Sequence, residues 1–276
     1  MRKVSLGRDN PVVDKKYPMG AAGFSCTSGD QSFFGMVYYT EGLGNPTVVL
    51  CHGFPGMEKN YDIAQFLRRA GFNAVIFSYR GAWGSHGAFK FSGVAEDTTN
   101  VVRMIQQRKL PEPDRFDSKR IVLAGHSMGG FAAFRAAAVL PEIEDLALLA
   151  VWNVGADAKR IQDNADDKQR VGDILSGAAC LAGTNQAKLL NEMLQNAEGF
   201  DLRNEALAFK ARHVLLIGAK EDKTTPIKLH QGPLASMLRR EGALISEKSL
   251  TADHSFSAKR IGVTRILLQW LTERGY

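Results

Sequence analysis

The stretch IVLAGHSMGGFAAFRAAA, residues 121–138, decides the fold of this chain. Its first four residues are apolar and predict a buried strand, while the small-residue segment from residue 130 onwards predicts a helix. Between them, Gly125 and Gly129 bound a sharp turn, where larger side chains would clash with the neighbouring strand and helix. Ser127 lies at the apex of this turn. We therefore expect its hydroxyl to stand above the edge of a sheet, beside helix N–H groups that favour a developing negative charge.

This strand–turn–helix pattern around Gly-His-Ser-Met-Gly resembles the nucleophile elbow of the α/β-hydrolases. The resemblance implies that Ser127 is a nucleophile. A serine hydroxyl attacks poorly unless a base takes its proton and an acid orients that base. In this family the three residues follow the chain order serine, acid, histidine. The partners of Ser127 are therefore expected downstream.

The histidines after Ser127 are His213, His230 and His254. His213 opens a predicted strand and is interpreted as a residue at the rim of the sheet. His230, in a helical stretch, is interpreted as a solvated or half-buried side chain. His254 lies in a polar loop, residues 251–257, which resembles the histidine loop of the family in its position and in its Asp-His pair followed by a small residue and Phe. The resemblance therefore implies that His254 is the base.

A polar loop follows the apolar strand at residues 214–217 and ends at Pro226, which is suited to the first turn of a helix. Asp222 in this loop resembles the catalytic aspartate that the family carries after the corresponding strand. Glu221 is its rival, but the spacing from Asp222 to Pro226 fits better. Asp157, after the preceding strand, is a further alternative, because some relatives carry the acid there.

The segment VVLCHGFPG, residues 48–56, resembles the oxyanion loop of the same superfamily. Acyl transfer passes through a tetrahedral oxyanion, which fixed backbone N–H groups stabilise. The resemblance implies that Met128 N–H, after the nucleophile, is one donor. Phe54 N–H is the other, because Pro55 has no N–H to offer. His52 is interpreted as a residue that holds the loop by hydrogen bonds.

A further loop, residues 79–87, follows the next strand and is rich in glycine. It is similar to a loop that passes beneath the nucleophile in esterase-like and peptidase-like α/β-hydrolases. Trp83 is the candidate substrate-binding residue, with a packed loop free of substrate contact as the alternative. For Arg80, pairing with an acidic group that braces the site is one interpretation, and a purely structural role in a packed loop is the favoured one.

The order of apolar patterns predicts the fold class, an α/β fold with a mostly parallel eight-stranded sheet and helices on both faces. An antiparallel hairpin is expected first, with strands at residues 24–27 and 31–40 and a turn at 29–30. The later strands are predicted at 47–51, 74–78, 120–124, 146–151, 212–217 and 244–250. The helices are predicted at 61–70, 94–108, 128–140, 227–240 and 258–272.

Residues 152–210 are too long for a plain crossover and are predicted to form a small helical cap, inserted into a core of residues 1–151 and 211–276. Its helices are expected at 165–181 and from an N-cap at Thr184. Leu190, Met193 and Leu194 would lie on one apolar face of the second helix and cover the pocket above Ser127. The alternative is that the extra helices pack beside the sheet.

Composition is typical of a globular enzyme, with 45% hydrophobic and 23% charged residues in a chain of 276. No run approaches about 18 apolar residues, and residues 1–9 lack the apolar stretch of a secretory signal. Three cysteines without metal-ligand spacing fit a reducing cytoplasm. The net charge of +6 is dispersed in short basic pairs, so neither a nucleic-acid nor a membrane partner is expected. The oligomeric state stays open.

Taken as a member of the α/β-hydrolase superfamily, nearest its esterase and serine-aminopeptidase-like branches, the chain is expected to hydrolyse an ester, thioester or amide. The substrate would be a small acyl compound, and no cofactor or metal is implied. Ser127, Asp222 and His254 would form the triad, with Phe54 and Met128 as the oxyanion donors. The alternatives are an acyltransferase that uses the same triad and, in another class, a non-catalytic binding member of the fold.

Overall fold

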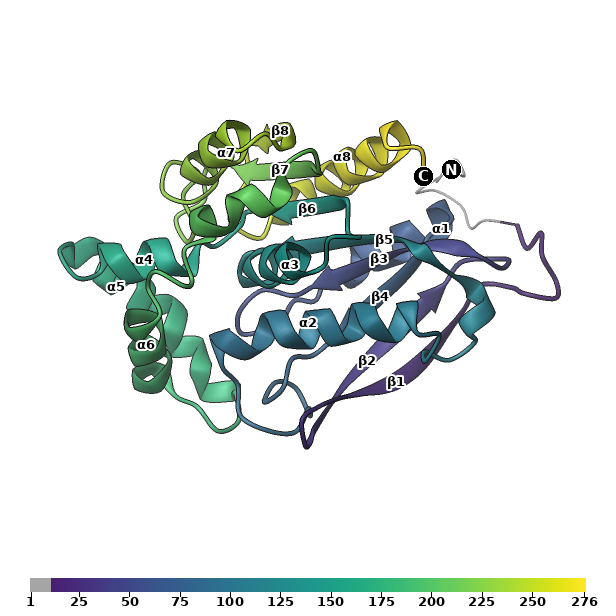
Figure 1. Cartoon of the computed structure of the whole chain (residues 1–276), viewed down its shortest axis with the longest axis horizontal. Coiled ribbons are helices and arrows are strands. Elements are labelled where there is room, and N and C mark those ends of the chain that lie inside the picture. The colour runs from purple at the N-terminus through teal and green to yellow at the C-terminus, as the bar shows by residue number, and fades with distance from the viewer. Residues whose placement is uncertain (1–10) are drawn as a thin grey trace.

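A computed structural model describes residues 11–276 and contains an eight-stranded sheet with the strand order β1-β2-β4-β3-β5-β6-β7-β8 (Figure 1). The strands are β1 Gly20–Ser28, β2 Gln31–Tyr39, β3 Asn45–Cys51, β4 Asn73–Phe77, β5 Phe116–His126, β6 Asp145–Leu149, β7 His213–Ala219 and β8 Leu244–Leu250. β1 pairs antiparallel with β2, β2 pairs antiparallel with β4, and β3 to β8 run parallel. The predicted fold class is confirmed, while the interpretation of residues 1–9 concerns a segment outside the described residues.

Helices cover both faces of the sheet, which explains why β4 and β6 are buried along their whole length. The helices on one face are α2 Phe91–Gln106, α3 Met128–Val139 and α7 Gln231–Arg240, and those on the other are α1 Tyr61–Ala70 and α8 Arg260–Glu273. Figure 1 shows α2 and α3 in front of the sheet. Because the strand side chains alternate, Val49 of β3 joins the first core and its neighbours Val48 and Leu50 join the second.

The chain between β6 and β7 forms helices that gather at one end of the sheet, at the left of Figure 1. They are α4 Val154–Arg160, α5 Ala165–Leu175, the 3-10 helix η2 Ser176–Cys180, α6 Gln186–Gln195 and the 3-10 helix η3 Leu202–Phe209. The helix expected at 165–181 therefore tightens after Leu175. The N-cap of α6 is Asn185, whose side chain accepts the N–H of Lys188, and the prediction of Thr184 was wrong.

The α6 helix turns its apolar face inward. Leu189 and Met193 are buried in the core that contains α2 and α3, Leu190 is half-buried against it, and Leu194 is 40% exposed. Burying an apolar helix face stabilises the protein most where water is fully excluded, as it is in the core. The apolar face of α6 is therefore used for packing.

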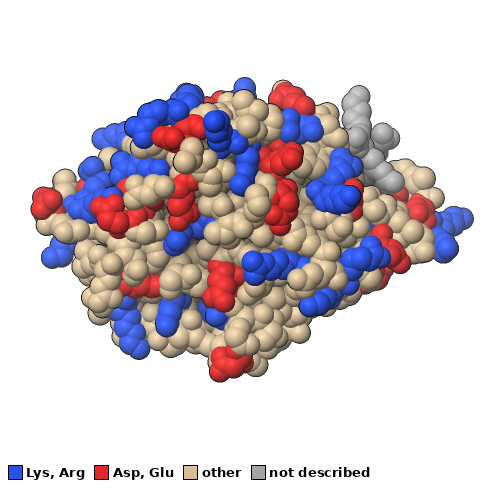
Figure 2. All heavy atoms as spheres, viewed as in Figure 1, with Lys and Arg blue, Asp and Glu red and all other residues tan. Residues whose placement is uncertain are grey.

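The surface carries both signs of charge. Figure 2 shows Lys and Arg side chains interspersed with Asp and Glu over the visible face. Within residues 11–276, no helix is both long and apolar enough to cross a membrane.

Candidate active site

The turn at Ser127 joins β5 directly to α3. Its backbone has φ 56° and ψ −121°, a conformation that a side chain makes costly. The neighbouring strand and the chain after it hold the turn in place. Ser127 N–H donates to the carbonyl oxygen of Leu149 at 2.9 Å, and the Ser127 carbonyl accepts from Trp152 N–H at 3.1 Å. The serine therefore stands at the carboxyl end of a central strand, where parallel sheets bind ligands.

The glycines on either side of Ser127 are required by close backbone approaches. A Cβ atom on Gly125 would lie 2.1 Å from the carbonyl oxygen of Gly129, and one on Gly129 would lie 2.0 Å from that of Cys51. Both distances are far below van der Waals contact with backbone atoms that cannot swing aside. The clash predicted for larger residues at these positions is confirmed.

Asp222 lies in the loop after β7, buried against His254. Its Oδ2 is 2.8 Å from Nδ1 of the imidazole. Its Oδ1 accepts the backbone N–H groups of Thr224 and Thr225, both at 2.8 Å. Burial raises the pKa of Asp222, but the bonds from His254 and Thr225 outweigh burial and leave it below its ordinary value. The carboxylate is therefore held ionised, as an acceptor for the His254 ring.

The two alternative acids lie elsewhere. Glu221 is exposed, and its backbone N–H donates to Ala252 in the strand-end turn. Asp157, on α4, is completely buried and accepts the indole N–H of Trp152 at 2.7 Å and N–H groups from both Nη1 and Nη2 of Arg170. Among residues 11–276, Asp222 is the carboxylate that bonds the His254 ring.

His254 follows β8 and is fixed on two sides. Its ring bonds Asp222, and its carbonyl oxygen lies 2.8 Å from Nε2 of His126, the residue before the serine. Ser127 and His254 line one cavity. Within the described part of the chain, no hydrogen bond joins the Ser127 hydroxyl to the imidazole, a contact that in ligand-free enzymes is often long and tightens when substrate binds.

The loop after β3 approaches the serine from the other side. A Cβ atom on Gly53 would lie 3.2 Å from the Ser127 Cβ, so this loop passes directly beside the elbow. The buried His52 ring donates from Nδ1 to the Gly53 carbonyl at 2.8 Å, and burial lowers the pKa of His52 to about 4, so the ring is neutral near pH 7. Met128 is the first residue of α3, and the first N–H groups of a helix have no intrahelical acceptor.

The cavity at Ser127 has a volume of about 670 Å³, and most of the residues that line it have polar or charged side chains. Its lining residues are Phe54, Ser127, Asp166, Gln169, Arg170, Asp173, Ile174, Lys223, Thr224 and His254. Half of them belong to α5, and none to α6. The expectation that Leu190, Met193 and Leu194 cover the pocket was therefore wrong. The apolar face of α6 packs against the core, and the polar side chains of α5 line the cavity instead.

Trp83 lies outside that lining. Its indole is 40% exposed, and its N–H donates to the Pro55 carbonyl at 2.8 Å, beside Phe54. The Trp83 side chain thus packs along the loop after β3. Whether it contacts a substrate stays a prediction.

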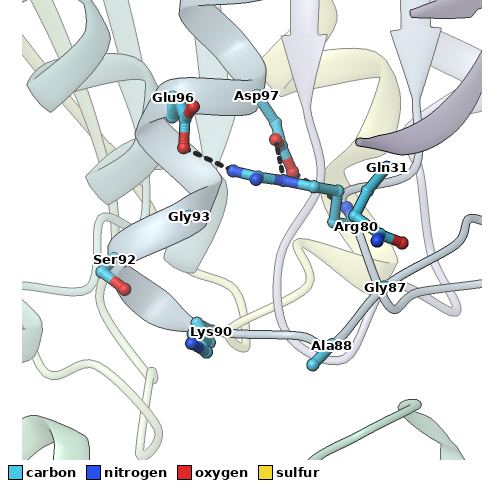
Figure 3. A pocket seen from close by; sticks show the side chains of 9 residues that line it. All are labelled: Gln31, Arg80, Gly87, Ala88, Lys90, Ser92, Gly93, Glu96 and Asp97. Carbon is cyan, nitrogen blue, oxygen red and sulfur yellow. Dashed lines mark hydrogen bonds and ion pairs between the residues drawn. The ribbon is translucent and has the colours of Figure 1, made fainter. Parts of the chain in front are cut away.

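Arg80 pairs with two acidic groups on α2. Figure 3 shows its guanidinium between Glu96 and Asp97 of α2, at the edge of a second cavity of about 420 Å³. Its Nη2 lies 2.6 Å from Glu96, and its Nε lies 2.6 Å from the buried Asp97. The two carboxylates offset the charge of Arg80, and these ion pairs fix the loop at residues 79–87 to α2.

His230 is completely buried, so the prediction of a solvated or half-buried side chain was wrong. Its Nδ1 accepts the backbone N–H of Asn153 at 3.3 Å, and its Nε2 lies 3.5 Å from Asp157. Burial lowers the pKa of His230 to about 4. Both partners belong to the segment after β6, far from His230 in sequence, and no local pattern signals them. Within residues 11–276, no group of three His, Cys, Asp or Glu side chains is arranged to hold a metal ion.

Comparisons with known proteins agree with this geometry. The model of the alpha/beta hydrolase family matches residues 48–257, which span the loop after β3, the serine turn, Asp222 and His254. A comparison with curated proteins finds no sequence match.

Solved structures share the fold at low identity. An acylaminoacyl peptidase from Pyrococcus horikoshii is 17% identical with a TM-score of 0.70, and the match covers 94% of this chain and 42% of the peptidase. An esterase from Pyrococcus furiosus is 16% identical with a TM-score of 0.70, covering 96% and 97% of the two chains. Est1E from Butyrivibrio proteoclasticus, solved with ferulic acid bound, is 17% identical with a TM-score of 0.67, covering 91% and 98%. By its family match and its fold, this chain belongs to the α/β-hydrolase family.

Proposed function

We propose that the protein is a serine hydrolase that cleaves an ester, thioester or amide through a covalent acyl-enzyme. The observation that carries this proposal is the 2.8 Å bond between Asp222 and the ring of His254, which shares a cavity with Ser127 on its strained turn. A hydroxyl, a base and an acid that orients the base are the parts this chemistry needs. The esterase and peptidase names of the similar structures support the same reaction class.

The proposed reaction has two halves. His254 Nε2 takes the Ser127 proton while Oγ attacks the acyl carbon, and Asp222 stabilises the imidazolium through Nδ1–H. The Phe54 and Met128 N–H groups hold the oxyanion. His254 then gives its proton to the leaving alcohol, thiol or amine as the scissile bond breaks. In the second half, water attacks the acyl-enzyme by the same route, and the acid product leaves with the Ser127 hydroxyl restored.

The cavity lining supports a short or polar acyl group over a long alkyl chain. Asp166, Gln169 and Asp173 face the site from α5, and a long alkyl chain would have to desolvate them. We assign residues 152–210 the role of a cap that selects substrates through α5. Trp83, exposed beside the loop after β3, would contact a part of the substrate that extends beyond the cavity.

Labelling by a fluorophosphonate probe tests the proposal, because such probes react with an activated serine. The wild-type protein should be labelled, and Ser127→Ala should lose labelling together with hydrolysis of short p-nitrophenyl esters, by about 10⁴-fold or more. Ser236→Ala is the matched control, since this serine is exposed on α7. Labelling of Ser127→Ala, or hydrolysis within tenfold of wild type, contradicts the proposed nucleophile. Formation of a new ester in the presence of an added alcohol at the expense of hydrolysis identifies acyl transfer instead.

A further inference from the structure

Arg170 occupies an unusual position on α5. It lines the cavity at Ser127, yet its side chain is only 15% exposed, because the guanidinium reaches back into the protein. Nη1 donates to the Thr224 carbonyl at 2.7 Å and to Asp157 at 3.0 Å. Nη2 donates to Asp157 at 2.6 Å and to Asp167 at 2.8 Å. Besides Asp167 on its own helix, this one side chain therefore binds two other parts of the chain.

The first of these parts is the turn that carries the acid. Thr224 accepts from Arg170 through its carbonyl and donates its N–H to Asp222 Oδ1 at 2.8 Å. The backbone carbonyl of Thr224 is thus engaged by the cap, and its backbone N–H by the carboxylate that bonds His254. A shift of the Thr224 backbone would move a hydrogen-bond donor of Asp222 with it.

The second part is the segment that holds the serine turn. Asp157 is completely buried and accepts the indole N–H of Trp152 at 2.7 Å. Trp152 in turn donates its backbone N–H to the carbonyl of Ser127 at 3.1 Å. The guanidinium of Arg170 is therefore the point where hydrogen bonds from the acid loop and from the nucleophile turn meet.

The charges around Arg170 explain why this contact is held. Asp157 and Asp167 bond it directly, Asp166 and Asp173 share its helix and cavity, and Lys223 is the nearby cation of the acid loop. His230, on the other side of Asp157, stays neutral near pH 7, because burial lowers its pKa to about 4. The buried Asp157 carboxylate thus depends on Arg170 for its countercharge, and a planar guanidinium can bond both carboxylate oxygens and a carbonyl at once.

We propose that Arg170 is a positioning residue that fixes the turn of Asp222 relative to the turn of Ser127. The inference rests on the proposed hydrolase function. Because Arg170 acts through Thr224 and Asp222 rather than on substrate, its loss should lower kcat and the rate of fluorophosphonate labelling more than it raises KM. The cap then has a second use besides selecting substrates, since it holds the acid loop in place.

The test uses variants that separate positioning from folding. Arg170→Met leaves the buried Asp157 carboxylate without its countercharge and is prone to unfold. The double variant Asp157→Leu with Arg170→Leu removes the pair together, which proteins tolerate far better, and still breaks the bond to Thr224. Arg170→Lys keeps the positive charge but not the planar guanidinium that bonds both carboxylate oxygens at once. Arg160→Met is the control, because within residues 11–276 the ion pair of Arg160 is with Asp167, at 2.7 Å.

We expect a folded double variant, by its thermal transition, with kcat and labelling rate lowered about 10- to 100-fold, which corresponds to a small displacement of a catalytic group. Arg170→Lys should recover part of the labelling rate, and Arg160→Met should stay within twofold of wild type. Proton NMR of the downfield His254 Nδ1–H resonance gives a readout independent of turnover, and this signal should broaden or shift in the double variant. A double variant that keeps both the wild-type labelling rate and the wild-type resonance overturns the inference.

Failure of the proposed function looks different. A wild-type protein that shows the downfield resonance but no labelling refutes the hydrolase proposal, and the resonance alone then decides the role of Arg170. If the double variant does not fold, the test of the inference is made with Arg170→Lys. An unchanged labelling rate and resonance there overturn the inference, and a lowered labelling rate with a shifted resonance in a folded protein supports it.

Discussion

The imidazole of His126 lies against that of His254, with ring centroids 4.8 Å apart and its Nε2 2.8 Å from the His254 carbonyl oxygen. A carbonyl only accepts, so Nε2 of His126 must carry the hydrogen. Burial, with a smaller contribution from His254, lowers the pKa of His126 to about 3, so this ring is neutral near pH 7. His126, the residue before the proposed nucleophile, therefore fixes the backbone of the proposed base.

His126→Phe should lower kcat about tenfold, with KM changed less. Phe keeps the ring but removes the donor, and about 1.4 kcal/mol, within the range of one buried hydrogen bond, is a tenfold change in rate. Steady-state kinetics on a short ester measure the effect. His86→Phe is the control, because His86 is exposed in the loop after β4. Equal kcat values for both variants would show that His126 only fills space.

Asp222→Asn should lower kcat by about 10⁴-fold, because the amide cannot support the imidazolium and favours the wrong tautomer. Glu221→Gln should stay close to wild type, since Glu221 is exposed. Both variants are measured with the same ester at the same pH. The reverse ranking would assign the acid to Glu221 and contradict the hydrogen bond seen here.

Gly129→Ala should abolish activity and destabilise the fold, because its Cβ would lie 2.0 Å from the carbonyl oxygen of Cys51. Gly262→Ala in α8 is the control, as its Cβ would be 3.6 Å from the nearest atom, an ordinary contact. Helical Ala is favoured over Gly by up to about 1 kcal/mol, so this control should keep or raise the melting temperature. Thermal unfolding of both variants checks the contrast.

Asp173→Leu should shift the ratio of kcat/KM towards longer acyl chains, because α5 lines the cavity. Each methylene that gains contact adds up to about 0.8 kcal/mol, roughly fourfold. Leu194→Ala on α6 should leave the chain-length profile of p-nitrophenyl esters unchanged, since Leu194 lies outside the cavity lining. A shift caused by Leu194→Ala and none by Asp173→Leu would restore α6 as the selective wall.

Asp201→Asn should destabilise the protein near neutral pH and much less in acid. Burial raises the pKa of Asp201, but bonds from Arg203, Asn153 and Lys159 outweigh it and leave the pKa well below the ordinary value. A depressed pKa contributes stability above the unfolded value of about 3.9, and that stability is lost as pH falls below it. The gap in melting temperature between wild type and variant should therefore narrow from about pH 5 to pH 3. A gap that widens on acidification would reverse the sign of the pKa shift.

The parts of the fold that follow from local patterns were predictable from sequence. The sheet is confirmed, and α1 lies at the predicted residues, because apolar spacing decides which side of an element is buried. The helix predicted from residue 227 begins instead at Gln231, since Leu229 and His230 bond back to Pro226 in a turn. Such a turn and a helix start with the same Pro, so the sequence does not separate them.

The site divides in the same way. The serine turn and the Asp222 loop carry motifs, and the structure places Asp222 against His254. The burial of His230 and the role of α5 come from contacts between distant segments, such as Arg170 with Thr224. An amphipathic pattern shows that α6 has an apolar side, but not whether that side packs against the core or lines the cavity. In the structure it packs against the core.

The helical segment between β6 and β7 also separates Ser127 from Asp222 and His254 along the chain. A break in the exposed turn at residues 182–183, between η2 and α6, would leave each fragment with only part of the proposed triad. The fragments would still share the parallel pairing of β6 with β7, in which Leu146 faces Val214 and Leu149 faces Ile217. Catalysis would then return only when the two fragments reassociate, so the crossover that forms the proposed cap also makes the molecule suited to use as a split reporter of non-covalent complementation.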